Sequence, residues 1–199
     1  MKIALKSAVI TLAMSVAAAA PAGTPARFAI EQDQVLLTYQ ASFGRQQIAG
    51  VSRALAGVIE EVPGAGLRVS ARAPIASFES GSPAVDALFR RALDADRFAT
   101  VEFEGQAPLG KRTGRFSVQL TGTLSLHGVS HGVTVPVKVL REGKTLFVQT
   151  AFPLDLASFG LAAPAIGGVS LGPRVQVELF ALLQPERASA FAGRPMPVR

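Results

Sequence analysis

The sequence of 199 residues contains no cysteine and no tryptophan, and it has one tyrosine and two histidines. The absence of cysteine excludes disulfide bonds, a thiol nucleophile and any cysteine-ligated metal. Phenylalanine, with 12 residues, supplies nearly all of the aromatic content. This content is therefore apolar, and it suits a protein core or the lining of a hydrophobic pocket.

Charge is also modest. The net charge is +6, and it falls to +4 if a leader that carries Lys2 and Lys6 is removed. The basic residues form no cluster with interleaved aromatic residues, which is the pattern of a nucleic-acid interface. We therefore expect a mildly basic, solvated surface and no nucleic-acid partner.

Residues 1–19 have the features of a secretory signal peptide. Lys2 and Lys6 precede a short apolar stretch at residues 8–16, and the alanines that follow offer a cleavage site, which we place between Ala19 and Ala20. The apolar stretch is too short for a comfortable membrane span. We expect an exported protein of the periplasm.

The rest of the chain divides into three parts. Residues 20–26 are rich in Pro, Ala and Gly and are expected to form a linker. Residues 27–184 contain the strand-like patterns and are expected to form one domain. Residues 185–199 have too little apolar content to pack, so we expect a flexible tail.

Strict alternation of apolar and polar residues marks the segment 116–139. The apolar positions are Phe116, Val118, Leu120, Leu124, Leu126, Val133, Val135, Val137 and Val139. Because successive side chains of a strand point to opposite faces, this segment predicts an antiparallel hairpin with one apolar face and a turn at His127–Ser130.

Other short strands occur along the chain, and residues 82–94 are the one segment with helical periodicity. Ser82 suits the N-cap, Pro83 suits the first helical position, and the apolar residues that follow recur at helical spacing. Eight or nine short strands with one helix predict an all-β antiparallel fold, either a sandwich or a closed barrel. An eight-stranded barrel can hold one small ligand.

Four segments resemble the YceI-like family in order and spacing. They are Leu124–Ser130 with Val133–Val137, Leu93–Phe98 with Val101–Phe103, Ser158–Leu161, and Arg174–Leu179. The resemblance runs from about Arg27 to Gln184. It implies an eight-stranded, lipocalin-like antiparallel β-barrel with one amphipathic helix. It also implies an apolar interior that takes up a long isoprenoid or a similar amphiphile.

The chain departs from the usual pattern of that family at five positions. These are Leu88, Ala92, Ala99, Leu156 and Ser158, where the family usually carries Arg, an aromatic residue, Pro, Arg and Asp. We expect a wider and less polar barrel mouth, and binding that follows chain length more than the headgroup.

The side chains expected to contact the ligand are apolar and come from the presumed inner faces. They are Val51, Leu55, Phe103, Phe116, Leu120, Leu124 and Phe159. The chain has no tryptophan and many small residues, so it is not expected to fill its own barrel, and unfilled apolar volume accepts an apolar guest. The helix at residues 82–94 would form part of the pocket wall or a lid.

The sequence gives little support for a catalytic or metal site. His127 and His131 lie four residues apart, but Gly128 and Gly132 oppose a helix there, and no glutamate stands where a zinc protease has its general base. Glu102 and Glu104 are expected on a solvated outer face. Asp155, Ser158 and His127 lack the G-x-S-x-G context of a hydrolase. We expect no metal, no cofactor and no enzyme activity.

The sequence therefore predicts a periplasmic binding or carrier protein for an apolar, isoprenoid-like or other lipid ligand, with a homodimer as a candidate assembly. A rival is a module without a natural ligand that acts through its surface in a stress response or in assembly. A barrel filled by its own side chains would favour that rival. An enzyme that acts on lipids is disfavoured, because no activated nucleophile can be assembled.

Overall fold

The alternating segment folds as the predicted hairpin. In the computed structural model, β7 (Gly114–Leu126) pairs with β8 (Val129–Glu142) from Leu126↔Val129 to Gly114↔Arg141. His127 and Gly128 form the turn with φ values of 53° and 73°. Two consecutive positive φ values are typical of the two-residue hairpin turn whose twist matches that of the strands. The structure describes residues 26–62, 64–108, 112–161, 165–166 and 169–186.

The other elements are mostly strands as well. They are β1 (Arg27–Ile30), β2 (Val35–Phe43), β3 (Gln46–Ser52), β4 (Ala56–Val62), β5 (Gly66–Pro74), β6 (Thr100–Ala107), β9 (Thr145–Asp155), β10 (Ala165–Ile166), β11 (Val169–Leu183), the helix α1 (Pro83–Ala92) and the 3-10 helices η1 (Gln32–Gln34), η2 (Ile75–Ser77) and η3 (Leu156–Phe159). The sheet runs in the order β1-β4-β5-β6-β7-β8-β9-β11-β2-β3, and β10 pairs with β11.

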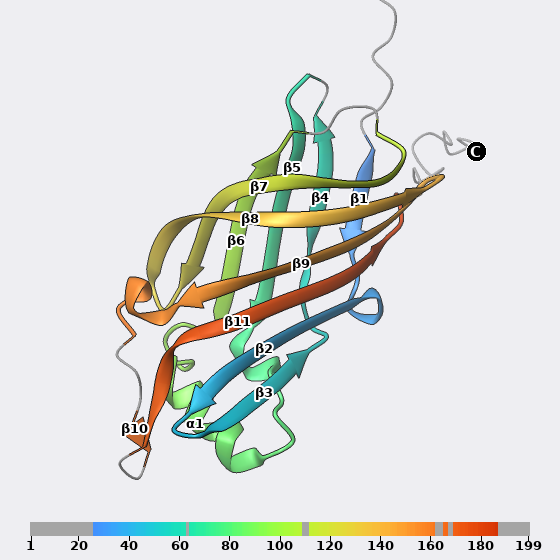
Figure 1. Ribbon diagram of the computed structural model, residues 1–199. Helices are drawn as coiled ribbons and strands as arrows, with labels where there is room; N and C mark the ends of the chain where they lie inside the picture. Colours follow the sequence, from blue (N-terminus) through green and yellow to red (C-terminus); the bar gives the residue numbers. More distant parts are fainter. Residues whose placement is uncertain (1–25, 63, 109–111, 162–164, 167–168, 187–199) are drawn as a thin grey trace, which may run out of the picture.

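Every pairing is antiparallel, and the sheet curls strongly on itself (Figure 1). The all-β, antiparallel, barrel-like prediction is confirmed. The number of strands differs from eight, because the chain adds short and edge strands to the series. The expected signal peptide, nearly all of the linker and most of the tail lie outside the described residues.

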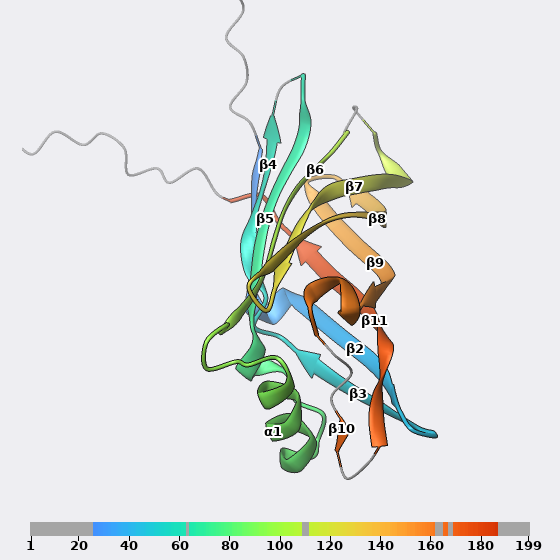
Figure 2. The same ribbon diagram turned by 90° about the vertical axis from the view of Figure 1, so that its left-hand side faces the viewer.

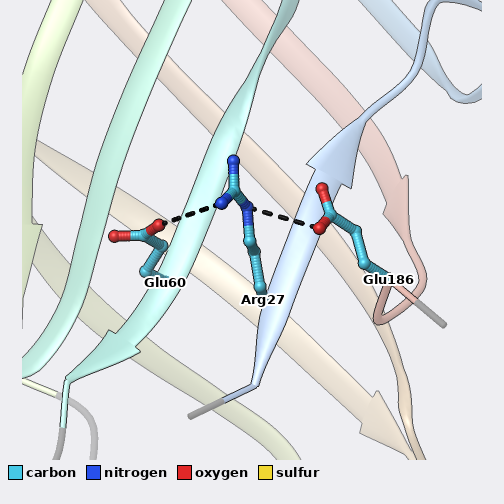
Figure 3. A network of polar contacts seen from close by, with 3 residues as sticks. All are labelled: Arg27, Glu60 and Glu186. Atoms are coloured by element: carbon cyan, nitrogen blue, oxygen red, sulfur yellow. Dashed lines mark ion pairs between the residues drawn. The ribbon is translucent and has the colours of Figure 1, made fainter. Parts of the chain in front are cut away.

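The first strand, at one edge of the sheet, also contacts the segment that follows β11. A β-bridge connects Phe28 of β1 with Pro185, just past β11, and the Glu186 amide donates to the Arg27 carbonyl at 2.7 Å. The Arg27 guanidinium also pairs with Glu60 at 3.7 Å and with Glu186 at 3.3 Å (Figure 3). Through this contact β1, β4, β5, β6, β7, β8, β9 and β11 form a ring at one end of the molecule.

The helix α1 lies at the other end of the curled sheet (Figures 1 and 2). Its start at Pro83 agrees with the sequence, but the Ser82 side chain makes no capping bond. Asp86 stabilises this helical turn instead, because its carboxylate accepts from the Ser80 amide at 2.8 Å and from the Ser80 hydroxyl at 2.6 Å. These hydrogen bonds lower the pKa of Asp86 below its usual value. None of the helices in the described part of the chain has the length and apolarity to cross a membrane.

Candidate ligand-binding cavity

The inner face of the curled sheet encloses an apolar cavity of about 250 Å³. Aliphatic and phenylalanine side chains from nearly every strand of the series line it. For comparison, an engineered apolar cavity of about 150 Å³ stays dry and binds benzene. The interior is therefore large enough for an apolar guest.

Glycines keep two aromatic rings flat against the wall of this cavity. A Cβ at Gly50 would overlap the ring of Tyr39, which lies opposite it across β2 and β3. A Cβ at Gly105 or Gly122 would meet the ring of Phe103 in the same way. The rings lie over the glycines and do not project into the interior. This arrangement is one physical reason why the interior is not filled.

Five of the seven expected contact residues line the cavity together. They are Leu55, Phe103, Phe116, Leu120 and Leu124. Leu55 and Leu124 are buried, and the other three are partly buried against the core. Their role in ligand contact stays a prediction, but the assigned inner face of β6 and β7 agrees with the structure.

Val51 does not line the cavity. Its side chain is 42% exposed, whereas its neighbours Gly50 and Ser52 are buried. Its backbone pairs with Glu79 through two hydrogen bonds of 2.9 Å, which cover the free edge of β3. The small residues Gly50 and Ser52 of β3 therefore face inward and Val51 faces outward, and the Tyr39 ring occupies the space over Gly50.

Phe159 lies in the core beside the cavity and not on its wall. It sits on η3, is 1% exposed, and its ring meets the ring of His131 edge-on at 5.6 Å. Its neighbours Leu156 and Leu161 line the cavity instead. The alternation of strands carries no signal for these two leucines, because they lie in and just after a 3-10 turn.

The five departures from the family pattern lie partly on the cavity wall and partly outside it. Ala92 and Leu156 line the cavity, and Leu156 is 6% exposed. Leu88 is half-buried on α1, while Ala99 and Ser158 are exposed. Only the first two can alter the polarity of the cavity wall directly.

Polar residues on the cavity wall are few. Thr38, Tyr39, Glu102, Arg141 and Thr150 border it. The Thr150 hydroxyl donates to the Pro136 carbonyl at 2.8 Å and is satisfied. Glu102 is exposed and accepts a hydrogen bond from Thr100, and Glu104 is exposed too, as expected for an outer face.

An ion pair spans the cavity at the end away from α1. The Arg141 guanidinium on β8 bonds the Glu61 carboxylate on β4 at 2.6 Å, and both side chains are largely buried, at 22% and 30% exposed. Strands β4 and β8 are not neighbours in the sheet. Glu61 precedes the β4–β5 turn, whereas α1 follows the other end of β5, so roughly 25 Å of strand separates the two ends.

Tyr39 provides a polar group near α1. Its ring stacks on Phe89 of α1 at 4.7 Å and meets Phe78 edge-on at 5.8 Å. The residue is 4% exposed, and its hydroxyl oxygen is buried without a hydrogen-bond partner among the described residues. Burial, and then the nearby charge of Asp86, raise the pKa of Tyr39 to about 12. The alternating pattern of β2 does not distinguish this residue from an ordinary core position, although it is the one tyrosine of the chain.

The histidines lie apart from the cavity wall. His127 occupies the β7–β8 turn, where its ring meets that of Phe98 at 4.9 Å, and His131 packs on Phe159. Within the described residues, no group of three or more His, Asp or Glu side chains is placed to hold a metal ion.

The fold and the cavity together define a barrel-like protein with an apolar interior. The family model of the YceI-like domain matches residues 19–181. The chain therefore belongs to the YceI-like family.

Solved structures give the same fold. A polyisoprenoid-binding domain from Saccharophagus degradans, implicated in plant cell wall breakdown, matches with a TM-score of 0.69 and 17% identity over 81% of this chain and 99% of its own. BcnA from Burkholderia cenocepacia matches with a TM-score of 0.65 and 17% identity over 77% of this chain and 98% of its own. No curated protein matched the sequence.

Proposed function

We propose that this protein binds or carries an apolar, isoprenoid-like or other lipid ligand inside its cavity, without catalysis. The observation that carries the proposal is the cavity of about 250 Å³ with its almost wholly apolar wall. The Saccharophagus degradans relative is described as polyisoprenoid-binding, which supports the same class of ligand. Removal of the leader at residues 1–19 and action in the periplasm are part of the proposal.

The energetics favour a hydrocarbon chain as the guest. Removing roughly 300 Å² of apolar ligand surface from water contributes several kcal/mol at about 25 cal/mol per Å². The contribution is non-directional, so an isoprenoid chain needs no specific polar contact along its length. The rival reading as a purely surface-acting module expects a filled interior, and the open cavity argues against it.

The two opposite faces of β7 allow a direct test of whether the binding site is internal. Leu120 lines the cavity, and its neighbour Gln119 is exposed on the outer face. We expect Leu120→Arg to abolish uptake of the apolar fluorophore N-phenyl-1-naphthylamine and to destabilise the fold by roughly 2 kcal/mol or more, because it places a charge in an apolar interior. The control Gln119→Arg should bind like the wild type. Equal uptake by the two variants would refute an internal site.

A further inference from the structure

The hydroxyl of Tyr39 is a hydrogen-bond donor without an acceptor. The residue borders the cavity, is 4% exposed, and has a buried oxygen that no described residue bonds. Buried polar side-chain atoms in proteins nearly always have a partner, because an unpaired one loses its water without compensation. A donor of this kind on the wall of a binding cavity points to an acceptor on the ligand.

The packing holds this donor in one place. The ring lies over Gly50, stacks on Phe89 with an interplanar angle of 7°, and meets Phe78 edge-on. These contacts fix the ring between β2 and α1. The hydroxyl is therefore prepositioned at the α1 end of the cavity, so little ordering is needed when a ligand arrives.

The charges nearby favour a neutral acceptor over an anion. Asp86 on α1 is 8% exposed and lies close enough for its charge to act on Tyr39. Arg90 is the cation beside Asp86, but it is not part of the cavity wall. Among the described residues, the cation on that wall is Arg141, which lies at the other end, where its Nη2 bonds Glu61 and its buried Nε has no partner. An anionic group at Tyr39 would face a carboxylate with no cation from the wall beside it.

We propose that the ligand carries a neutral hydrogen-bond acceptor, such as a ketone, quinone or ester carbonyl, and that the Tyr39 hydroxyl donates to it at the α1 end of the cavity. This inference rests on the proposed function and adds the headgroup class to it. It also revises the expectation that binding follows chain length more than the headgroup, which was based in part on the absence of arginine at Leu88 and Leu156.

The test compares two probes with similar isoprenoid chains, the ketone farnesylacetone and the hydrocarbon farnesene. Their dissociation constants are measured by displacement of N-phenyl-1-naphthylamine from the wild type and from Tyr39→Phe. The phenylalanine keeps the ring and its stacking but removes the donor. We expect the preference for the ketone to fall by roughly threefold to tenfold in Tyr39→Phe, the size of one net hydrogen bond. Affinity for farnesene should stay within about twofold.

A matched control removes a hydroxyl that is already satisfied. Thr150→Val deletes a cavity-bordering hydroxyl that donates to Pro136, so the ratio between ketone and hydrocarbon should remain that of the wild type. Farnesyl phosphate tests the charge argument, and its affinity should not depend on Tyr39 more than that of the ketone.

The outcomes separate this inference from the proposed function. An unchanged ratio in Tyr39→Phe, or an equal loss in Thr150→Val, would overturn the role of Tyr39 while leaving a lipid-binding cavity. A stronger dependence of farnesyl phosphate on Tyr39 would overturn the neutral acceptor. Failure of the wild type to bind either farnesylacetone or farnesene would overturn the proposed function, and the inference with it.

Discussion

At the scale of single residues, Tyr39 combines ring packing with a buried hydroxyl. It is also the one phenolic reporter of the chain, which has one tyrosine and no tryptophan. Its ring organises contacts between β2, α1 and the segment after η2. Its hydroxyl is a polar group at a position of β2 that the apolar/polar alternation marks as apolar. Any phenolic signal of the protein therefore reports on the cavity.

Burial of the Tyr39 hydroxyl makes the stability of the protein depend on pH in the alkaline range. Burial raises its pKa from 10.0 to about 12. The unfolded chain then loses this proton at lower pH than the folded chain, so the free energy of unfolding should decrease as pH rises from 10 to 12. Phenolate absorbance, followed together with circular dichroism, should show ionisation near pH 12. Ionisation near pH 10 in the folded protein would show that the hydroxyl is solvated.

Residue placement could be predicted where alternation is regular. The inner positions of β7, among them Leu120 and Leu124, follow from the period of two alone. Val51 could not be placed in this way, because Gly50 faces inward to accommodate the Tyr39 ring and Ser52 is buried on the same face. The phase of β3 is set by a contact with another strand, and a single-sequence pattern does not contain that contact.

At the scale of elements, glycines on paired strands decide how far aromatic rings project into the cavity. Gly50 of β3 lies under the ring of Tyr39, and Gly105 and Gly122 lie under the ring of Phe103. The pattern of residues 48–60 alone predicts one long strand with a bend at Gly50. The structure instead ends β3 at Ser52 and starts β4 at Ala56, since the chain crosses from the edge strand β3 to β4, which lies beside the opposite edge strand β1.

Gly50→Ala tests the role of the glycines. The added methyl group overlaps the Tyr39 ring, so the ring must leave the wall and enter the cavity. We expect a loss of about 1–3 kcal/mol in unfolding free energy and a severalfold weaker uptake of N-phenyl-1-naphthylamine. The control is Gly132→Ala, where nothing lies within 4 Å of the new atom, and it should change stability by less than about 0.5 kcal/mol. Equal effects of the two changes would contradict the packing argument.

The ion pair between Arg141 and Glu61 links β8 and β4 across the interior. Glu61→Gln removes the charge that pairs with a largely buried guanidinium, so we expect a loss of about 1 kcal/mol in unfolding free energy and faster exchange of the fluorophore. Asp94→Asn is the control, because the Asp94–Arg97 pair is longer, at 3.5 Å, and more exposed. Chemical denaturation and stopped-flow fluorescence would measure both effects. A larger effect of Asp94→Asn would contradict the linking role.

At the scale of the whole molecule, the curled sheet, the strand contact at Arg27 and the helix α1 enclose one apolar space (Figures 1 and 2). The fold class, the hairpin of β7 and β8 and the inner face of β7 could be predicted, because they depend on local periodicity. The joining of β1 to the end of β11 could not, because it brings together residues more than a hundred positions apart through one bridge and one ion pair. The predicted homodimer and the periplasmic location remain predictions.

Native mass spectrometry of the protein purified from its own host tests the central claim most directly. The account predicts a population whose mass exceeds that of the polypeptide by one small molecule, and this molecule should be released on collision and recovered by organic extraction. The added mass should be absent from Leu120→Arg and retained in Gln119→Arg, because only the first change enters the cavity. A bare polypeptide mass in the wild type, together with no uptake of farnesene by the purified protein, would contradict the account.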